Sequence, residues 1–448
     1  MVKVEVTIIS KETIKPSTPI LNHLKPYKLT LLDQVTPATY VPMVLFYPMT
    51  DLNLDVSQII AQLKNSLADT LNIFYPLSGS IKDNLFIHDF NMGAPFLEAH
   101  VNCSMSEFLK HQETDLLSLF LPYRAFCLES DITTSQIAVQ LNVFVCGGIA
   151  IGLCCSHKIG DAATMSSFLH SWAAIFIGSP EKVRSPNFSE GSTMFPPRDS
   201  LPQKYIATMD NLWFKEGDYV TRRFVFHDKA ITTLRAKARS DLVPNPTRIE
   251  ALTCFIWKHC MAASKAKSPV SKKTSIMVQA VNLRTRMKPH LSDASVGNIF
   301  WWAPAGADLT MEERELNELV NLVNESIAGF DTDCAESLQG DEGFSTFSNY
   351  FGHLQDMFFA EVKPDVCAFT CWLRFFNDID FGWGKPFWIG IMGKVGPKFR
   401  NLIIFSETPR GIGIEAWVTI DEKEMVILEN DPEFLAFASL NPSISISL

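Results

Sequence analysis

The stretch that most constrains the fold is an apolar run of thirteen residues, from Val143 to Cys155. Gly147 and Gly148 interrupt this run. A membrane-spanning helix needs about 20 apolar residues, so the run is too short to cross a bilayer. It predicts two buried strands joined by a tight turn at the paired glycines.

The apolar run leads into the sequence Ser156-His157-Lys158-Ile159-Gly160-Asp161. Beyond it, apolar residues recur at spacings of three and four from Met165 to Phe176, which predicts a helix that Asp161 can cap. His157 therefore lies between a core strand and a helix, with a sharp turn at Gly160. A histidine held by rigid elements at a sheet edge suits a general base. A core histidine bonded to a backbone carbonyl fits the same pattern.

Composition and charge restrict the class of protein. With 448 residues, 47% of them hydrophobic, the chain is long enough for two folded domains. The net charge of -10 argues against a general binder of nucleic acid or of anionic membranes, because both need a positive surface. Ten cysteines occur without a C-x-x-C pattern, which indicates a reducing compartment. We expect a cytoplasmic protein without a metal site.

Strand and helix patterns alternate along both halves of the chain, which predicts an α/β protein. The stretch between Gly178 and Tyr219 carries five prolines and little periodicity, so it predicts a linker. The expected division is a first domain at 1–178, a crossover linker at 179–218 and a second domain at 219–448. Helices are predicted at 56–73, near 106–120, after a capping box of Thr247 and Glu250, and after a capping box of Thr310 and Glu313.

A basic window runs from Ala251 to Ser292, where no Asp or Glu occurs. Its cations are Lys258, Lys265, Lys267, Lys272, Lys273, Arg284, Arg286 and Lys288. In an acidic protein this window is where we expect a phosphorylated ligand to bind. For the four lysines between Ser264 and Lys273, a solvated loop is an equally good interpretation.

The sequence Asp380-Phe381-Gly382-Trp383-Gly384 is the second distinctive stretch. Glycines on both sides of a tryptophan favour close backbone packing over chemistry. We therefore expect a structural role for Asp380 and for the whole five-residue loop.

These two motifs, in this order, resemble the BAHD family of plant acyl-CoA-dependent acyltransferases, and especially its alkaloid-acetylating branch. Further matching segments extend the resemblance over the whole chain: Ser10 to Pro16, Leu31-x-Asp33-Gln34, Tyr75-Pro76-Leu77, Gly147-Gly148, Asn282-Leu283-Arg284, Gly297-Asn298 and Thr370-x-Trp372. One departure is Ser80, where relatives often carry an arginine.

The resemblance implies two chloramphenicol-acetyltransferase-like domains of mixed sheets flanked by helices, with a channel between them and His157 at its middle. It implies that Asp161 faces away from the substrate and pairs with Arg284, and that the Asp380 loop is structural. It places Thr370 and Trp372 beside the reacting carbonyl, where an indole N–H can stabilise an oxyanion. Gly297, Asn298, Lys258 and Arg286 are the expected cofactor-binding residues.

The expected function is transfer of an acyl group, most simply acetyl, from coenzyme A to a hydroxyl of a hydrophobic plant alkaloid or terpenoid. The partners are then a small-molecule alcohol and acyl-CoA, with no permanently bound cofactor, no nucleic acid and no membrane, and we expect a monomer. A benzoyl or hydroxycinnamoyl donor is an alternative on the same machinery. A non-catalytic homologue that binds a metabolite or a partner is another, but its signature would be loss of His157 or Gly160.

Two further expectations concern the site. Cys155 lies two residues before His157, but it ends an apolar run in which a buried thiol is a poor nucleophile. We therefore expect direct transfer in a ternary complex rather than an acyl-enzyme. An aromatic-lined acceptor pocket is expected from Phe300, Trp301, Trp302, Phe347, Phe351 and Phe369.

Overall fold

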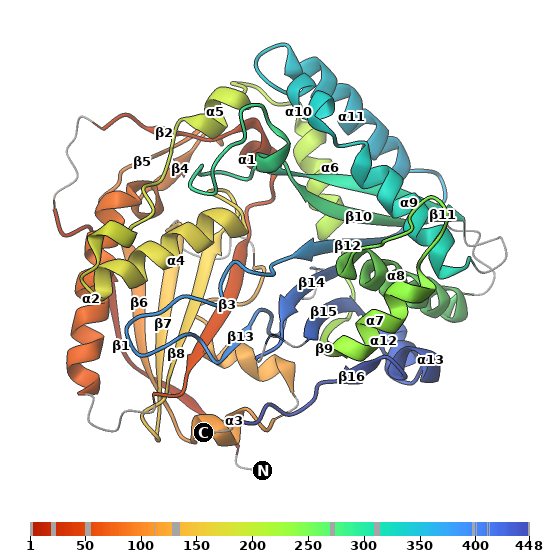
Figure 1. Ribbon diagram of the computed structural model, residues 1–448. Helices are drawn as coiled ribbons and strands as arrows, with labels where there is room; N and C mark the ends of the chain where they lie inside the picture. Colours follow the sequence, from red (N-terminus) through yellow and green to blue (C-terminus); the bar gives the residue numbers. More distant parts are fainter. Residues whose placement is uncertain are drawn as a thin grey trace.

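The computed structural model describes residues 3–446 except 19–23, 50–54, 112, 128–134, 269–273, 309–313, 397–398, 400, 410 and 412. Two large mixed sheets, each flanked by helices, form the two halves of the molecule (Figure 1). The predicted α/β class with two mixed sheets is confirmed.

The first sheet has the strand order β1-β6-β7-β8-β3-β13. Its strands are β1 (Val6–Ile14), β3 (Tyr40–Tyr47), β6 (Ala94–Val101), β7 (Ile137–Phe144), β8 (Ile149–Ser156) and β13 (Trp388–Gly390). The apolar run of the sequence forms the end of β7 and all of β8 except its last residue, Ser156, with Gly147 at φ +82° in the turn between the two strands. Every residue of β8 is buried, so the predicted strand pair is confirmed.

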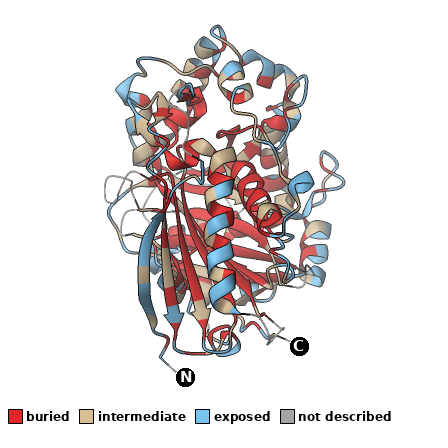
Figure 2. Cartoon of the chain, turned by 90° about the vertical axis from the view of Figure 1, so that its left-hand side faces the viewer, coloured by how far each residue is buried: buried red, intermediate tan, exposed pale blue. Residues whose placement is uncertain are grey.

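Two long helices, α2 (Val56–Ile73) and α4 (Ala162–Phe176), contact each other beside this sheet. Helix α2 has the predicted bounds, with Ile59, Leu63 and Leu67 on its buried face. Its outer face is exposed, as is the edge strand β1 (Figure 2). In α4, the Asp161 side chain accepts a hydrogen bond from the Thr164 N–H at 3.1 Å, which confirms the predicted cap.

The second sheet has the order β11-β10-β12-β14-β15-β9-β16. Its strands are β9 (Tyr219–His227), β10 (Thr274–Asn282), β11 (Phe300–Asp308), β12 (Asp365–Cys371), β14 (Leu402–Glu407), β15 (Gly413–Asp421) and β16 (Ala438–Leu440). Strand β12 runs parallel to both β10 and β14, whereas β11 is antiparallel to β10. A small third sheet consists of β2 (Tyr27–Lys28), β5 (Phe86–His88) and β4 (Ser80–Lys82).

The remaining helices are α1 (Leu31–Val35), α3 (Met105–Phe108), α5 (Glu190–Met194), α6 (Gln203–Trp213), α7 (Asp228–Lys237), α8 (Arg248–Lys267), α9 (Leu316–Ala328), α10 (Thr332–Ser337), α11 (Gly343–Phe358), α12 (Glu422–Glu429) and α13 (Pro432–Leu435). Short 3-10 turns are η1 (Tyr75–Ser78), η2 (Thr114–Phe120), η4 (Pro180–Lys182) and η5 (Arg284–Arg286). The capping box of Thr247 and Glu250 opens α8 as predicted. The capping box of Thr310 and Glu313 lies outside the described residues, and α9 begins at Leu316.

Three features differ from the sequence-based expectation. Strand β13 belongs to the second predicted domain but pairs with β3, so residues 219–448 do not form a single unit around the second sheet. The predicted linker contains a regular helix, α6, with Tyr205, Met209 and Trp213 buried on one face. The helix predicted near 106–120 is split into α3 and η2.

Two side-chain hydrogen bonds join η2 to the first sheet. The Asn142 side chain on β7 donates to the Phe120 carbonyl at 3.0 Å, and Gln140 donates to the Leu119 carbonyl at 2.8 Å. These bonds fix η2 against the sheet and satisfy carbonyls at its C-terminal end.

Candidate active site

A cavity of about 360 Å³ surrounds His157. Its wall combines residues of the first half, such as Thr39 and Met165, with residues of β10, β11, β12 and β14. Helix α6 adds Met209 and Trp213. The described residues thus place His157 in a largely apolar cavity between the two halves, which is the arrangement that the sequence predicted.

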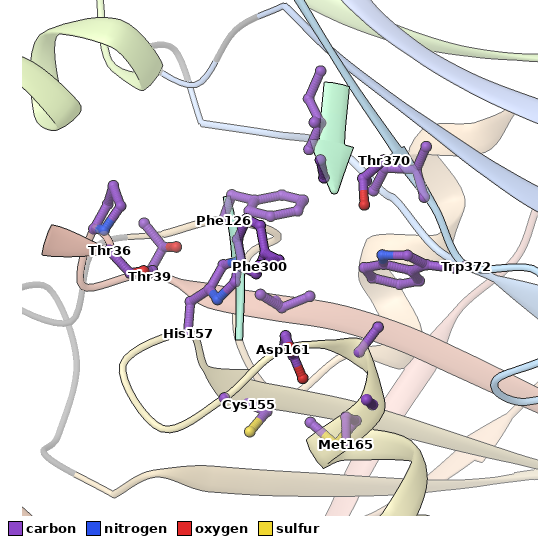
Figure 3. Close-up of a pocket in the computed structure, with 18 of the residues that line it drawn as sticks. Thr36, Thr39, Phe126, Cys155, His157, Asp161, Met165, Phe300, Thr370 and Trp372 are labelled. Atoms are coloured by element: carbon purple, nitrogen blue, oxygen red, sulfur yellow. The ribbon is translucent and has the colours of Figure 1, made fainter. Parts of the chain in front are cut away.

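The backbone of His157 is held from two sides. Its N–H donates to the Thr39 carbonyl at 2.7 Å, and its carbonyl accepts from the Asn298 side-chain amide at 2.7 Å. Thr39 precedes β3 and Asn298 precedes β11, so both halves fix the histidine. The Phe300 ring lies beside the imidazole, with 6.1 Å between the ring centroids (Figure 3).

Burial lowers the pKa of His157 below its usual value, because the charged imidazolium is poorly solvated in the cavity. The Asp161 charge and the Asn298 side chain oppose this effect without overcoming it. The imidazole is therefore neutral at pH 7, which is the form that can accept a proton.

Gly160 follows His157 in the turn before α4. Its φ is not positive, so the glycine is not required by a left-handed backbone. A Cβ at this position would instead lie 2.5 Å from the side chain of Thr164. Close approach of the first turn of α4, rather than the turn itself, therefore explains why glycine fits here.

The predicted pairing of Asp161 with Arg284 is present. Arg284 Nη1 lies 2.6 Å from Asp161 Oδ2, and Nη2 lies 3.1 Å from Oδ1, so the pair is bidentate. The Asp161 side chain is 10% exposed and the Arg284 side chain is 1% exposed. The carboxylate also accepts the N–H groups of Thr164 and Ile299, at 3.1 Å each. Both carboxylate oxygens of Asp161 thus accept hydrogen bonds from protein groups, and the side chain points away from the imidazole (Figure 3).

Gly297 and Asn298, which the sequence suggested as cofactor-binding residues, lie in the seam between the halves. The Asn298 amide donates to Asp33 Oδ1 at 2.7 Å as well as to the His157 carbonyl. The Gly297 carbonyl accepts from Arg284 Nη2 at 3.2 Å. Both residues therefore support His157 and Arg284, and neither lines the cavity that the described residues form.

The wall opposite His157 carries Thr370 and Trp372, at the end of β12 and just beyond it (Figure 3). The backbone N–H of Trp372 donates to the Phe405 carbonyl at 2.8 Å, and this bond holds Trp372 next to β14. Within the described part of the chain, the indole N–H of Trp372 has no hydrogen-bond partner. It is therefore available to a ligand.

The Asp380 loop lies away from the cavity. Asp380 Oδ1 accepts the backbone N–H groups of Gly382 at 2.7 Å and Gly384 at 2.9 Å. Phe381 and Trp383 stack on each other at 5.5 Å and pack against Phe176 of α4. The geometry supports the packing role that the sequence predicted.

Several cations of the basic window have partners within the protein. Lys267 pairs with Asp421 and Glu424, and Arg286 donates to the Ile327 and Phe330 carbonyls at the end of α9. Lys258 is partly exposed on α8, and neither it nor Arg286 belongs to the described lining of the cavity. Lys272 and Lys273 lie outside the described residues. The contacts of the window therefore identify no phosphate site.

The expected aromatic wall is correct for Phe300 and Trp302 only among the six residues proposed. Side chains alternate along β11, so Trp301 faces the other way and packs on Phe347 and Phe351 of α11. Phe369 lies in the separate core of the second half. The sequence analysis missed Met209 and Trp213, although Tyr205, Met209 and Trp213 recur every four residues, which is a helical spacing.

The described residues contain no cluster of three or more metal-ligating side chains, no helix of sufficient length and apolarity to cross a bilayer, and no disulfide among the cysteines. The cavity itself offers His157, with its pKa lowered by burial, and the side chains of Thr370 and Trp372 on the opposite wall.

Comparisons with known proteins agree with this geometry. The model of the Transferase family matches residues 4–435. Akuammiline synthase 2 of Alstonia scholaris is 41% identical over 445 residues, covering 98% of both chains. Limonoid 7-O-acetyltransferase of Citrus sinensis is 41% identical over 459 residues, covering 98% of this chain and 99% of that protein. The crystal structure of vinorine synthase, known from Rauvolfia serpentina, superposes with a TM-score of 0.80 at 33% identity, covering 97% of this chain and 99% of the other.

Proposed function

Since the chain belongs to the Transferase family, the BAHD acyltransferases, we propose that it transfers an acetyl group from acetyl-CoA to a hydroxyl of a hydrophobic polycyclic plant metabolite. The observation that carries this proposal is the position of His157 in an apolar cavity between the two halves, where burial lowers the pKa of its imidazole. An alkaloid or terpenoid alcohol fits this wall because apolar side chains predominate in it.

In the proposed reaction, His157 takes the proton of the hydroxyl as its oxygen attacks the thioester carbonyl. The C–O bond forms, the carbonyl π electrons move to oxygen, and the resulting intermediate collapses with loss of the coenzyme A thiolate. The protonated imidazole then returns its proton to the thiolate. The lowered pKa of His157 favours this role, because the base must be neutral before the reaction begins.

Trp372 and Thr370 stabilise the oxyanion in this mechanism. Their side chains lie across the cavity from His157, and the indole N–H has no partner among the described residues. A fixed donor of this kind is most effective in a cavity that excludes water. Asp161 and Arg284 act as positioning residues, because their ion pair holds the turn after His157 and does not reach the reacting atoms.

We propose direct transfer in a ternary complex, with Cys155 as a bystander. Cys155 is buried, and its sulfur points away from the imidazole (Figure 3). A thiol nucleophile needs contact with its base. Acyl-CoA is then a second substrate rather than a resident cofactor.

We further propose that the protein is a monomer and that it works in a reducing compartment, the cytoplasm. All ten cysteines are free thiols. This supports a reducing environment.

The test is a product assay with a panel of polycyclic alkaloid and terpenoid alcohols. Purified protein is mixed with acetyl-CoA, and ester formation is followed by mass spectrometry together with release of the free thiol. We expect an acetyl ester from at least one alcohol. Benzoyl-CoA and a hydroxycinnamoyl-CoA serve as alternative donors, and faster transfer from either would replace acetyl in the proposal. No ester with any donor would contradict it.

A further inference from the structure

Asn282 is a polar residue of the cavity wall that the mechanism above does not use. It is the last residue of β10, opposite Phe300 on the antiparallel strand β11. Residues opposite each other in an antiparallel pair project from the same face. Ala280 and Trp302, the next such pair, also line the cavity. Asn282 therefore projects from the face that carries Phe300, the ring beside His157.

The orientation of the Asn282 amide is fixed by the backbone. Its Oδ1 accepts the Arg284 N–H at 3.0 Å, so the oxygen faces the turn η5 and the amide nitrogen faces the other way. Within the described part of the chain, Nδ2 has no hydrogen-bond partner. The Asn282 side chain lies in the cavity wall and is partly exposed, and its Nδ2 atom is not sealed off from the open space of the cavity.

We propose that the Asn282 amide N–H binds a hydrogen-bond-accepting oxygen, such as a ring ketone, that the acceptor alcohol carries in addition to its reacting hydroxyl. This inference rests on the proposed acyl transfer and makes Asn282 a residue that determines acceptor specificity. The acceptor class becomes alcohols that carry a second, hydrogen-bond-accepting oxygen rather than plain hydrocarbon alcohols.

The physical reason is the contrast between one fixed donor and its apolar surroundings. Apolar walls discriminate weakly between ligands of similar shape. A donor that loses its water and finds no acceptor is left unsatisfied, which penalises the wrong ligand. An oxygen at this point is therefore the feature by which the wall around Phe300 and Trp302 can select among polycyclic alcohols.

The oxyanion offers a competing use for the same N–H. We assign the oxyanion to Trp372 and Thr370, because these two side chains face His157 across the cavity (Figure 3). Strand β12 lies beside β10, with Phe369 opposite Gln279, so both strands end at the cavity. Asn282 sits on the β11 side of that end, next to Phe300.

The experiment compares wild type with Asn282→Asp and Asn282→Ala on two alcohols. One is a panel member that carries a ring ketone, and the other is its analogue with a methylene in place of that ketone. Asn282→Asp keeps the oxygen that accepts from Arg284 and removes the donor, whereas Asn282→Ala removes both. For the ketone-bearing alcohol, kcat/KM should fall about 10- to 100-fold in both variants. For its methylene analogue, kcat/KM should change little in Asn282→Ala, whereas the carboxylate of Asn282→Asp has no partner on this ligand and should lower it. In both variants KM for acetyl-CoA should stay at the wild-type value.

Each other outcome overturns the inference in a recognisable way. Equal losses with both alcohols in Asn282→Ala, together with slower hydrolysis of acetyl-CoA in the absence of alcohol, would assign Asn282 to the oxyanion. Equal losses with a lowered melting temperature would assign it to structure, through its bond to Arg284. Unchanged kinetics with the ketone-bearing alcohol would exclude any contact. Failure of wild type to acylate any alcohol would instead contradict the proposed function.

Discussion

Asp161 and Asp380 each belong to one of the two distinctive motifs, yet their side chains bind partners at very different distances along the sequence. Asp161 pairs with Arg284, which is 123 residues away, and so joins the two halves beside His157. Asp380 accepts from Gly382 and Gly384, two and four residues on, and so shapes only its own loop. The difference teaches that the first aspartate couples the fold to the position of the base, whereas the second serves local packing.

The largest effect is expected when the ion pair between Asp161 and Arg284 is broken. Asp161→Ala leaves Arg284 as an unpaired charge that is 1% exposed, which should cost about 3–5 kcal/mol of unfolding free energy. Turnover should fall as well, because the turn that carries His157 loses its anchor. Urea unfolding and steady-state kinetics measure the two effects.

The milder Asp161→Asn variant should lose activity mainly through misplacement of His157, with reduced stability. A charge-swapped double variant, Asp161→Arg with Arg284→Asp, serves as the control for the pair. If the double variant recovered nothing while each single variant folded normally, the positioning role of the pair would be wrong.

On the other side of the comparison, Gly382→Ala should destabilise the protein. Gly382 has φ +92°, and an added Cβ would meet Ile177 Cγ2 at 3.1 Å. A non-glycine residue in this backbone region costs about 1–3 kcal/mol, so the melting temperature should fall. The matched control is Gly352→Ala in α11, where φ is not positive and a Cβ has open space. The control should not destabilise. A stable but inactive Gly382→Ala protein would show that the loop takes part in the chemistry.

The pH dependence should separate the two regions, because a titrating base is present only on the His157 side. Protonation of His157 removes the base, so kcat/KM should be level near pH 7 and fall about tenfold per pH unit below the pKa of His157. Burial places that pKa below the usual value of 6.5, so the decline should begin below pH 6.5. A midpoint well above 6.5 would mean that the imidazole is not desolvated in the way described.

The smallest effect is expected from Cys155→Ala, which should keep most of the turnover. The residue lines the cavity but has no part in the proposed transfer. Double-reciprocal plots for the two substrates should intersect. Parallel lines, or an acetyl group on Cys155 in the mass spectrum, would replace direct transfer by an acyl-enzyme.

Much of the fold near His157 could be predicted because its signals are local. The paired glycines, the apolar run and the cap at Asp161 all lie within twenty residues of one another. Helix α2 was predictable for the same reason, since one amphipathic face repeats over its whole length. Periodicity of this kind depends only on neighbouring residues.

The missed features depend on partners far away in the chain. Strand β13 has three residues, and its place is set by pairing with β3 rather than by any pattern of its own. The bond from the Asn298 side chain to the backbone of His157, 141 residues earlier, was not foreseen either. Contacts over such distances follow from the packing of the two halves, which composition and spacing do not specify.

The most direct test of the account is the turnover of His157→Ala with the folded state verified. A positioned general base contributes about 10²–10⁴-fold, so kcat should fall by that factor. The melting temperature should stay close to that of wild type, since both backbone hydrogen bonds of residue 157 remain and its Nδ1 has no partner among the described residues. A folded His157→Ala protein that retains near wild-type turnover would contradict the central claim.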